Sequence, residues 1–231
     1  MILLLPCAGM AQTVSLGVMG GIPVTEAFEP ANLQLPLPLG GQTTYTSRAK
    51  QYTVGPAVEV SLPLGLALEV DALYKRLDYN FSTRLSTPSS GTRAEEDHNI
   101  VSRWDLPLLL KYKARRLLSL APYFSGGLNT NYIVNTTQVS RSNFCFLPGC
   151  SLTLLPPVKR RITPAELRYR SAEGVVIAAG FEFHVRYVRL ASELRYTRWA
   201  HENFHEAIRT SGFRSNLDQT EVLVTLRPSR N

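Results

Sequence analysis

The stretch that decides the fold is "RWDLPLLLKYK", residues 103–113. Its alternate residues form an apolar row with an aromatic residue at each end: Trp104, Leu106, Leu108, Leu110 and Tyr112. The residues between them include Arg103, Asp105 and Lys111, which are charged. Alternation with a period of two residues predicts a β-strand with one apolar and one polar face.

The same alternation recurs along the chain and predicts further strands. Together with the first stretch there are eight, over residues 13–22, 51–62, 66–81, 99–113, 120–135, 173–184, 188–199 and 216–227. The connections alternate between short turns, such as "PLG" at residues 63–65, and long polar segments. The long segments cover residues 23–50, 82–98, 136–172 and 200–215.

This alternation of short and long connections favours a membrane barrel over a compact soluble domain. Soluble domains rarely carry loops beyond ~12–15 residues, and four are expected here. Outer-membrane barrels have an even number of antiparallel strands, short periplasmic turns and long extracellular loops. We therefore predict an all-β fold, an eight-stranded antiparallel up-and-down transmembrane β-barrel with both termini on the periplasmic side. The alternative is a soluble lipocalin-like ligand-binding barrel, in which Leu108 and Ile177 would point inward.

The polar faces of the predicted strands carry both charge signs among small residues. Buried charges must pair to offset their desolvation, and the interior of an eight-stranded barrel has room for little beyond side chains. We therefore predict a plugged lumen rather than an open pore. Its expected charge network consists of Glu59, Glu69, Asp71, Arg103, Asp105, Lys111, Glu182, Arg189, Glu193, Arg195 and Glu221.

Aromatic residues at the ends of the apolar rows predict a girdle at the boundary between lipid and water. Its expected members are Trp104, Tyr112, Tyr196 and Trp199. Trp199 is out of phase with Tyr196, so the strand is expected to twist or bulge there.

Composition restricts the remaining choices. The 231 residues carry a net charge of +7, and 19% of them are charged. No run of ~18 apolar residues exists, so no transmembrane helix is expected. The basic residues are scattered among strands and turns, and nucleic-acid binding is not expected. Residues 1–11 are predicted to be a short signal peptide, which leaves residues 12–231 as the barrel domain; a buried N-terminal strand is the alternative.

Two features of the long segments suggest chemistry. Cys145 and Cys150 flank "FLPG" and are candidates for a small disulfide, with two free thiols or half of a metal site as the alternatives.

"HENFH", residues 201–205, matches the pattern H-E-x-x-H. On a helix this pattern holds zinc between two histidines, here His201 and His205, with the glutamate as general base. The segment supplies neither a third ligand nor a sheltered cavity. We predict a polar loop with chance spacing, and no catalytic residue, metal or cofactor.

Four segments together resemble a known family: "RWDLPLLLKYKA", "APYFSGGLN", "GVVIAAGFEF" and "LASELRYTRW". They are similar to the bacterial outer-membrane β-barrel domain proteins, often called porin-family proteins, which resemble the small OmpA-type barrels in architecture. The resemblance covers residues 13–227 and implies export and insertion into the bacterial cell outer membrane, but no single activity.

We therefore expect a monomeric, non-enzymatic protein with a structural or surface-interaction role through its extracellular loops. Outer-membrane lipids are the expected partners. The basic run Lys159–Arg160–Arg161 could hold lipopolysaccharide phosphates or could simply be solvated. An enzyme that acts on lipid or peptide at the barrel rim is the alternative function.

Overall fold

The computed structural model describes residues 13–29, 31–35, 41–48, 52–87, 91–114, 120–145, 153–185, 187–205 and 213–229. The predicted signal peptide and Cys150 lie outside these residues, and of Cys145 only the backbone is described. Nearly all of the described residues are in antiparallel strands, which confirms the all-β prediction. Within these ranges, no helix is both long and apolar enough to cross a membrane.

The strands fall into long and short ones. They are, in chain order, β1 (Val14–Pro23), β2 (Phe28–Glu29), β3 (Ala31–Leu35), β4 (Gly41–Arg48), β5 (Thr53–Ser61), β6 (Leu66–Asp71), β7 (Leu73–Thr87), β8 (Gly91–Lys113), β9 (Leu120–Cys145), β10 (Thr153–Leu154), β11 (Val158–Arg161), β12 (Ser171–Val185), β13 (Val188–Trp199), β14 (Arg214–Ser215) and β15 (Asp218–Pro228). A 3₁₀ turn at Pro63–Gly65 joins β5 to β6.

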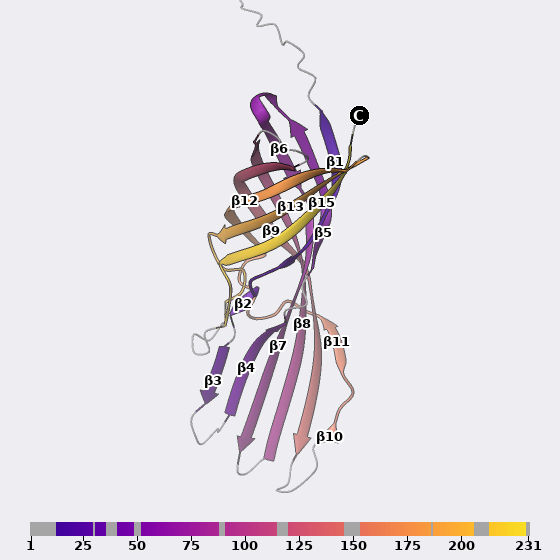
Figure 1. The fold of residues 1–231 in the computed structure, drawn as a ribbon. Coiled ribbons are helices and arrows are strands. Elements are labelled where there is room, and N and C mark those ends of the chain that lie inside the picture. The colour runs from indigo at the N-terminus through magenta and orange to yellow at the C-terminus, as the bar shows by residue number, and fades with distance from the viewer. Residues whose placement is uncertain are drawn as a thin grey trace, which may run out of the picture.

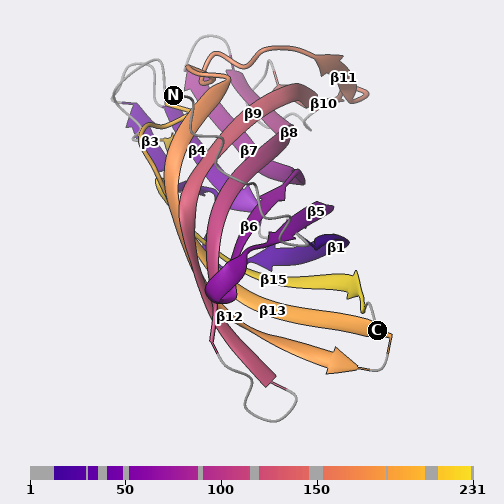
Figure 2. The ribbon, with the colours of Figure 1, turned by 90° about the horizontal axis from the view of Figure 1, so that it is seen from above.

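The long strands pair in a closed circuit (Figures 1 and 2). Each strand pairs with the next one around the ring, in the order β1, β5, β6, β8, β9, β12, β13, β15 and back to β1. This order follows the chain, so the topology is up-and-down. Because the circuit closes through β8 and β9, no strand of the ring leaves an unpaired edge along its shared length.

The outer face of the ring is apolar and exposed, whereas the inner face holds the charged residues, the opposite of a soluble barrel. On β12, Val176 is fully buried, whereas its neighbours Val175 and Ile177 are 58% and 57% exposed. On β8, Leu108 is 47% exposed and Leu109 is fully buried. The lipocalin-like alternative, which required Leu108 and Ile177 to point inward, is therefore wrong.

One end of the ring continues into an open sheet (Figure 1). There β7, β8 and β9 run on together, β4 pairs with β7, β3 pairs with β4, and β10 and β11 pair with β9. The prediction of loops over residues 82–98 and for much of 23–50 and 136–172 is wrong. The strands of the open sheet satisfy their backbone N–H and C=O groups by pairing with each other and need no apolar face. Their sequences therefore lack the alternation of apolar and polar residues from which a strand is predicted.

Two irregularities shape the ring. The single strand predicted over residues 66–81 is interrupted at Ala72, whose N–H donates to the carbonyl of Pro56 at 3.0 Å. Between β8 and β9, Arg103 pairs with Ile133 while Ser102 pairs with Asn135. The extra residue in β9 is a bulge, which changes the side to which the following residues of that strand point.

Gly127 of β9 lies where a neighbouring strand comes very close. A Cβ atom added there would be 1.9 Å from the carbonyl oxygen of Leu108, whereas at the adjacent Gly126 the nearest atom would be 3.7 Å away. We expect Gly127→Ala to lower the free energy of unfolding by about 1–3 kcal/mol, the usual cost of overpacking. Urea unfolding in detergent micelles measures the effect. Gly126→Ala is the matched control, and equal losses for the two variants would contradict the register of β8 and β9.

Candidate functional site

Charged side chains fill the middle of the ring, and most of the cations contact more than one acid. The Nζ atom of Lys111 on β8 lies 2.6 Å from Glu69 on β6 and 3.7 Å from Glu59 on β5. The Nζ atom of Lys113 lies 2.6 Å from Glu59 and 2.9 Å from Glu182 of β12. Four strands are thus tied together across the interior by two lysines.

Arg195 of β13 is the centre of a second group of contacts. Its side chain is 1% exposed, and its guanidinium lies 2.7 Å from Glu193, 2.9 Å from Asp71 and 3.6 Å from Glu69. The hydroxyl of Tyr123 donates to Glu193 at 3.0 Å. The guanidinium therefore has carboxylates on several sides, as a fully buried cation requires.

Two further arginines, one on β15 and one on β13, join this group. The guanidinium of Arg227 on β15 lies 3.2 Å from Glu59 and also bonds to Glu69. Arg189 lies 3.5 Å from Glu182, nearer the end of the ring where β1 begins and β15 ends.

A second layer lies closer to the open sheet. Lys75 of β7 is 2.7 Å from Asp105 and 2.5 Å from Glu221. Arg103 is 2.8 Å from the same Asp105 and donates to Gln219 at 2.9 Å. Asp105 is fully buried between the two cations.

Together these residues form what we call the interior ion network. Its seven acids are Glu59, Glu69, Asp71, Asp105, Glu182, Glu193 and Glu221, and its seven bases are Lys75, Arg103, Lys111, Lys113, Arg189, Arg195 and Arg227. The formal charges cancel, seven against seven. A neutral, mutually paired set is the arrangement in which burying charge costs least.

The structure places all eleven residues of the predicted charge network in this interior. The predicted network left out the bases Lys75, Lys113 and Arg227 and the bridging Tyr123, although Lys75 shares the charged face of Glu69 and Asp71 in the predicted strand. The signal was available for Lys113, which lies two residues from Lys111 and so shares its face. It was also available for Arg227, which lies six residues from Glu221 on the same strand.

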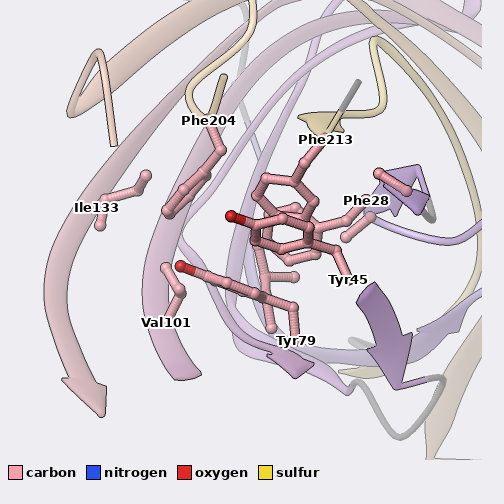
Figure 3. Packing of buried hydrophobic residues seen from close by; sticks show 10 residues of the cluster. Phe28, Tyr45, Tyr79, Val101, Ile133, Phe204 and Phe213 are labelled. Atoms are coloured by element: carbon pink, nitrogen blue, oxygen red, sulfur yellow. The ribbon is translucent and has the colours of Figure 1, made fainter. Parts of the chain in front are cut away.

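Aromatic side chains close the ring above the second layer (Figure 3). Phe28 packs 5.0 Å from Tyr79 and 5.3 Å from Phe204, and Phe213 stacks 4.4 Å from Tyr45, between ring centroids. We call this cluster the aromatic plug; its buried members also include Ala27, Ala31, Leu77, Val101 and Ile133.

The plug combines segments that are far apart in the chain. Phe28 comes from β2, and Phe204 and Phe213 flank the connection between β13 and β15. The short pairing of β14 with β2 holds these two segments together. The sequence analysis assigned both of these segments to polar loops. The three phenylalanines within them, which indicated a buried cluster, were overlooked.

The space between the ion network and the plug is very small. A cavity of about 10 Å³ lies there, lined in part by Ala27, Leu77, Lys75 and Arg103, and such a volume holds at most about one water molecule. At the other end of the ring, a hollow of about 540 Å³ is lined by Ser15, Ser61, His184 and Arg189 among others. Over the described residues, the interior is therefore a vestibule that ends at a filled wall.

Three of the four predicted girdle residues lie on the outer face of the ring. Trp104, Tyr112 and Tyr196 are 37%, 53% and 37% exposed on the outer face of the ring. Trp199 is only 4% exposed, and its ring lies 5.3 Å from the guanidinium of Arg103 in the interior. The strand neither twists nor bulges there, because Trp199 continues the regular pairing with Gly174. Trp199 lies four residues after Arg195 on the same strand, so its side chain points to the same, inner face.

Other exposed aromatic residues lie beside Trp104 and Tyr112, at the two ends of the apolar row on β8. Beside Trp104 lie Tyr74, 5.5 Å away between centroids, and Tyr132, its partner in the pairing of β8 with β9. Beside Tyr112 lies Phe124, which is 63% exposed. Exposed aromatic residues therefore form one row near each end of the apolar face.

The histidine motif is not helical and is used for packing. His201 donates from Nε2 to the carbonyl of Ser171 at 2.9 Å, and Nδ1 of His205 lies 3.0 Å from Glu202. Between them, Asn203 and Phe204 are buried, and Phe204 belongs to the plug. Among the described residues, no group of three histidine, cysteine or acidic side chains could hold a metal ion.

The sequence matches the family model described as outer membrane protein beta-barrel domain over residues 10–198. The chain therefore belongs to this family, and it is a protein of the bacterial outer membrane. The exposed apolar face of the ring is accordingly its lipid-facing surface.

Solved structures of similar architecture include two outer-membrane proteins. OprG from Pseudomonas aeruginosa is 10% identical, with 93% of each chain covered and a TM-score of 0.48. Neisserial surface protein A is 12% identical, with 92% of this chain and 96% of that chain covered and a TM-score of 0.35. No curated protein matches the sequence.

Removing one buried cation tests the ion network. Arg195→Met leaves three carboxylates around an apolar side chain, and we expect it to lower the free energy of unfolding at pH 7 by about 3–5 kcal/mol. Urea unfolding in detergent micelles measures the loss. Arg198→Met is the matched control, because Arg198 lies on the same strand but pairs with Asp218 at the surface. Its unfolding midpoint should stay close to that of the unchanged protein. An equal shift for both variants would show that the interior charges do not stabilise the ring.

Proposed function

We propose that the chain is a monomeric, eight-stranded transmembrane barrel with a closed lumen, which acts through the part that projects outside the membrane. The ring strands are β1, β5, β6 with its continuation β7, β8, β9, β12, β13 and β15. The observation that carries the proposal is the filled interior: a neutral ion network in the membrane region and an aromatic plug above it.

The spacing of the aromatic rows supports a membrane-spanning role. Trp104 and Tyr112 are eight residues apart on β8, which is about 27 Å along the strand. At a tilt of ~40° this corresponds to roughly 21 Å along the membrane normal, close to the ~25 Å apolar band of outer-membrane barrels.

The orientation follows from the connections. The turn at Pro63–Gly65 is short and lies at the end of the ring where β1 begins, and periplasmic turns are short in this class of barrel. The open sheet and the plug then lie on the extracellular side.

A non-enzymatic role fits the way in which the motif histidines are engaged. His201 and His205 hold the segment that carries Phe204 over the ring, and they do so through contacts with a carbonyl and with Glu202. The proposed role is structural support and surface contact.

An enzyme at the barrel rim is the second candidate, and one observation favours it. An open hollow of about 520 Å³ is lined by Tyr169, Ser171, Glu173 and His201 at the outer rim. Hydrolysis of lipid or peptide there would require His201 as a base, so loss of such an activity in His201→Ala would replace the proposed role by this one.

Membrane insertion and closure can be tested together. The folded protein should fractionate with outer membranes and migrate faster on a gel unheated than boiled. Reconstituted in a planar bilayer, it should give no steady conductance, because the interior is filled. The double variant Phe28→Ala, Phe213→Ala removes much of the plug but leaves the ion network, so it should also stay closed. Stable unit conductance of the unchanged protein would contradict the closed lumen, and a freely soluble monomer would contradict the barrel.

A further inference from the structure

The basic run at residues 158–161 is a strand whose side chains alternate between two faces. In β11, Lys159 pairs with Val139 of β9, Arg160 with Gln138 and Arg161 with Thr137. Paired residues of antiparallel strands point to the same side of the sheet. Lys159 and Arg161 therefore share the face of Val139 and Thr137, and Arg160 lies on the opposite face.

The face of Lys159 and Arg161 continues the lipid-facing surface. Thr137 pairs with Ile100 and Val139 with His98. On β8 these residues have the same phase as Trp104, which belongs to the exposed outer row. Ile100 lies four residues beyond Trp104, which is about 14 Å along the strand and, at a tilt of ~40°, roughly 10 Å above the aromatic row.

This part of the face is rich in positive charge. Lys159 and Arg161 are exposed, and within the described part of the chain neither is paired with a carboxylate. Arg141 lies on the same face, and its partner in the pairing of β9 with β8 is Glu96, the one acid at that position. Asp78, the partner of Ile100 on β7, is the other acid of this face, and it already lies 3.5 Å from Arg76. Among the described residues, Lys159 and Arg161 are therefore left without a carboxylate partner at the levels of His98 and Ile100.

We propose that Lys159 and Arg161, assisted by Arg141, bind the phosphate groups of lipopolysaccharide in the outer leaflet. The inference rests on the proposed orientation of the barrel, because that orientation brings this face to the level of the anionic headgroups. Cations near an anionic membrane surface contribute to lipid binding individually. Arginine also binds a phosphate through two parallel hydrogen bonds. The rigid pairing of β11 with β9 fixes Lys159 and Arg161 about 7 Å apart, so that both can engage one headgroup.

Binding is measured by fluorescence anisotropy of labelled rough lipopolysaccharide added to the full protein, refolded in uncharged detergent micelles. We expect Arg161→Gln to weaken binding about five-fold, and Lys159→Gln by a similar factor. Arg160→Gln is the matched control: it removes the same charge from the adjacent residue on the opposite face and should change the affinity less than two-fold. Dephosphorylated lipopolysaccharide should bind weakly to all variants, and inorganic phosphate should compete poorly.

Each outcome has a defined meaning. Equal losses for Arg161→Gln and Arg160→Gln, or undiminished binding of the dephosphorylated lipid, would overturn the inference. Strong competition by inorganic phosphate would assign the site to free anions and would overturn it as well. Each variant is first checked for heat-dependent gel migration. If the unchanged protein lacks that property, the proposed function has failed, whereas loss of face specificity in a folded barrel refutes only the lipid site.

Discussion

The constraint on which the structure depends is that fourteen charged side chains share one interior and must neutralise one another there. An unpaired buried charge costs several kcal/mol, so every strand of the ring has to present its charged residues in the right register. A slip of one residue would turn the whole polar face of a strand toward lipid. Lys111, with carboxylates from three strands within 4 Å, shows how the network itself specifies register. The same filling leaves no continuous passage over the described residues.

Because the interior of the ring is filled, the proposed function lies in the parts outside the membrane. The bulge at Ser102 and Arg103 changes the side to which the outer half of β9 points, and this determines which residues of β11 continue the lipid-facing surface. The aromatic plug packs the segments around Phe28 and Phe204 over the end of the ring that is proposed to face outward. The plug, the open sheet and the basic face are all attached to the same closed circuit of paired strands.

The sequence predicted the strands in which apolar and polar residues alternate with a period of two. The prediction failed where this alternation is absent, and where a residue was assigned by its type and not by its position in the alternation. The bounds of strands such as 188–199 were predicted correctly, because exposed residues such as Val188, Leu194 and Tyr196 alternate with buried charged residues such as Glu193 and Arg195. Trp199 was assigned to the girdle by residue type, although its phase with Arg195 already indicated the interior. The hairpin of β7 and β8 beyond residue 82 is polar on both faces, so alternation could not reveal it. The plug joins Phe28 to Phe213 across most of the chain, a contact that no local pattern specifies. The pairing of Cys145 with Cys150 stays a prediction.

The central claim is that the charged face points inward and the apolar face toward lipid. Leu108 and Leu109 test it most directly, because they are adjacent, identical in type and opposite in exposure. Each is replaced by cysteine in a variant without the native cysteines, and the folded protein in vesicles is treated with a thiol-reactive fluorophore. Leu108→Cys should react and be quenched by brominated lipids, whereas Leu109→Cys should react only after unfolding. Quenching at position 109 with protection at position 108 would contradict the account.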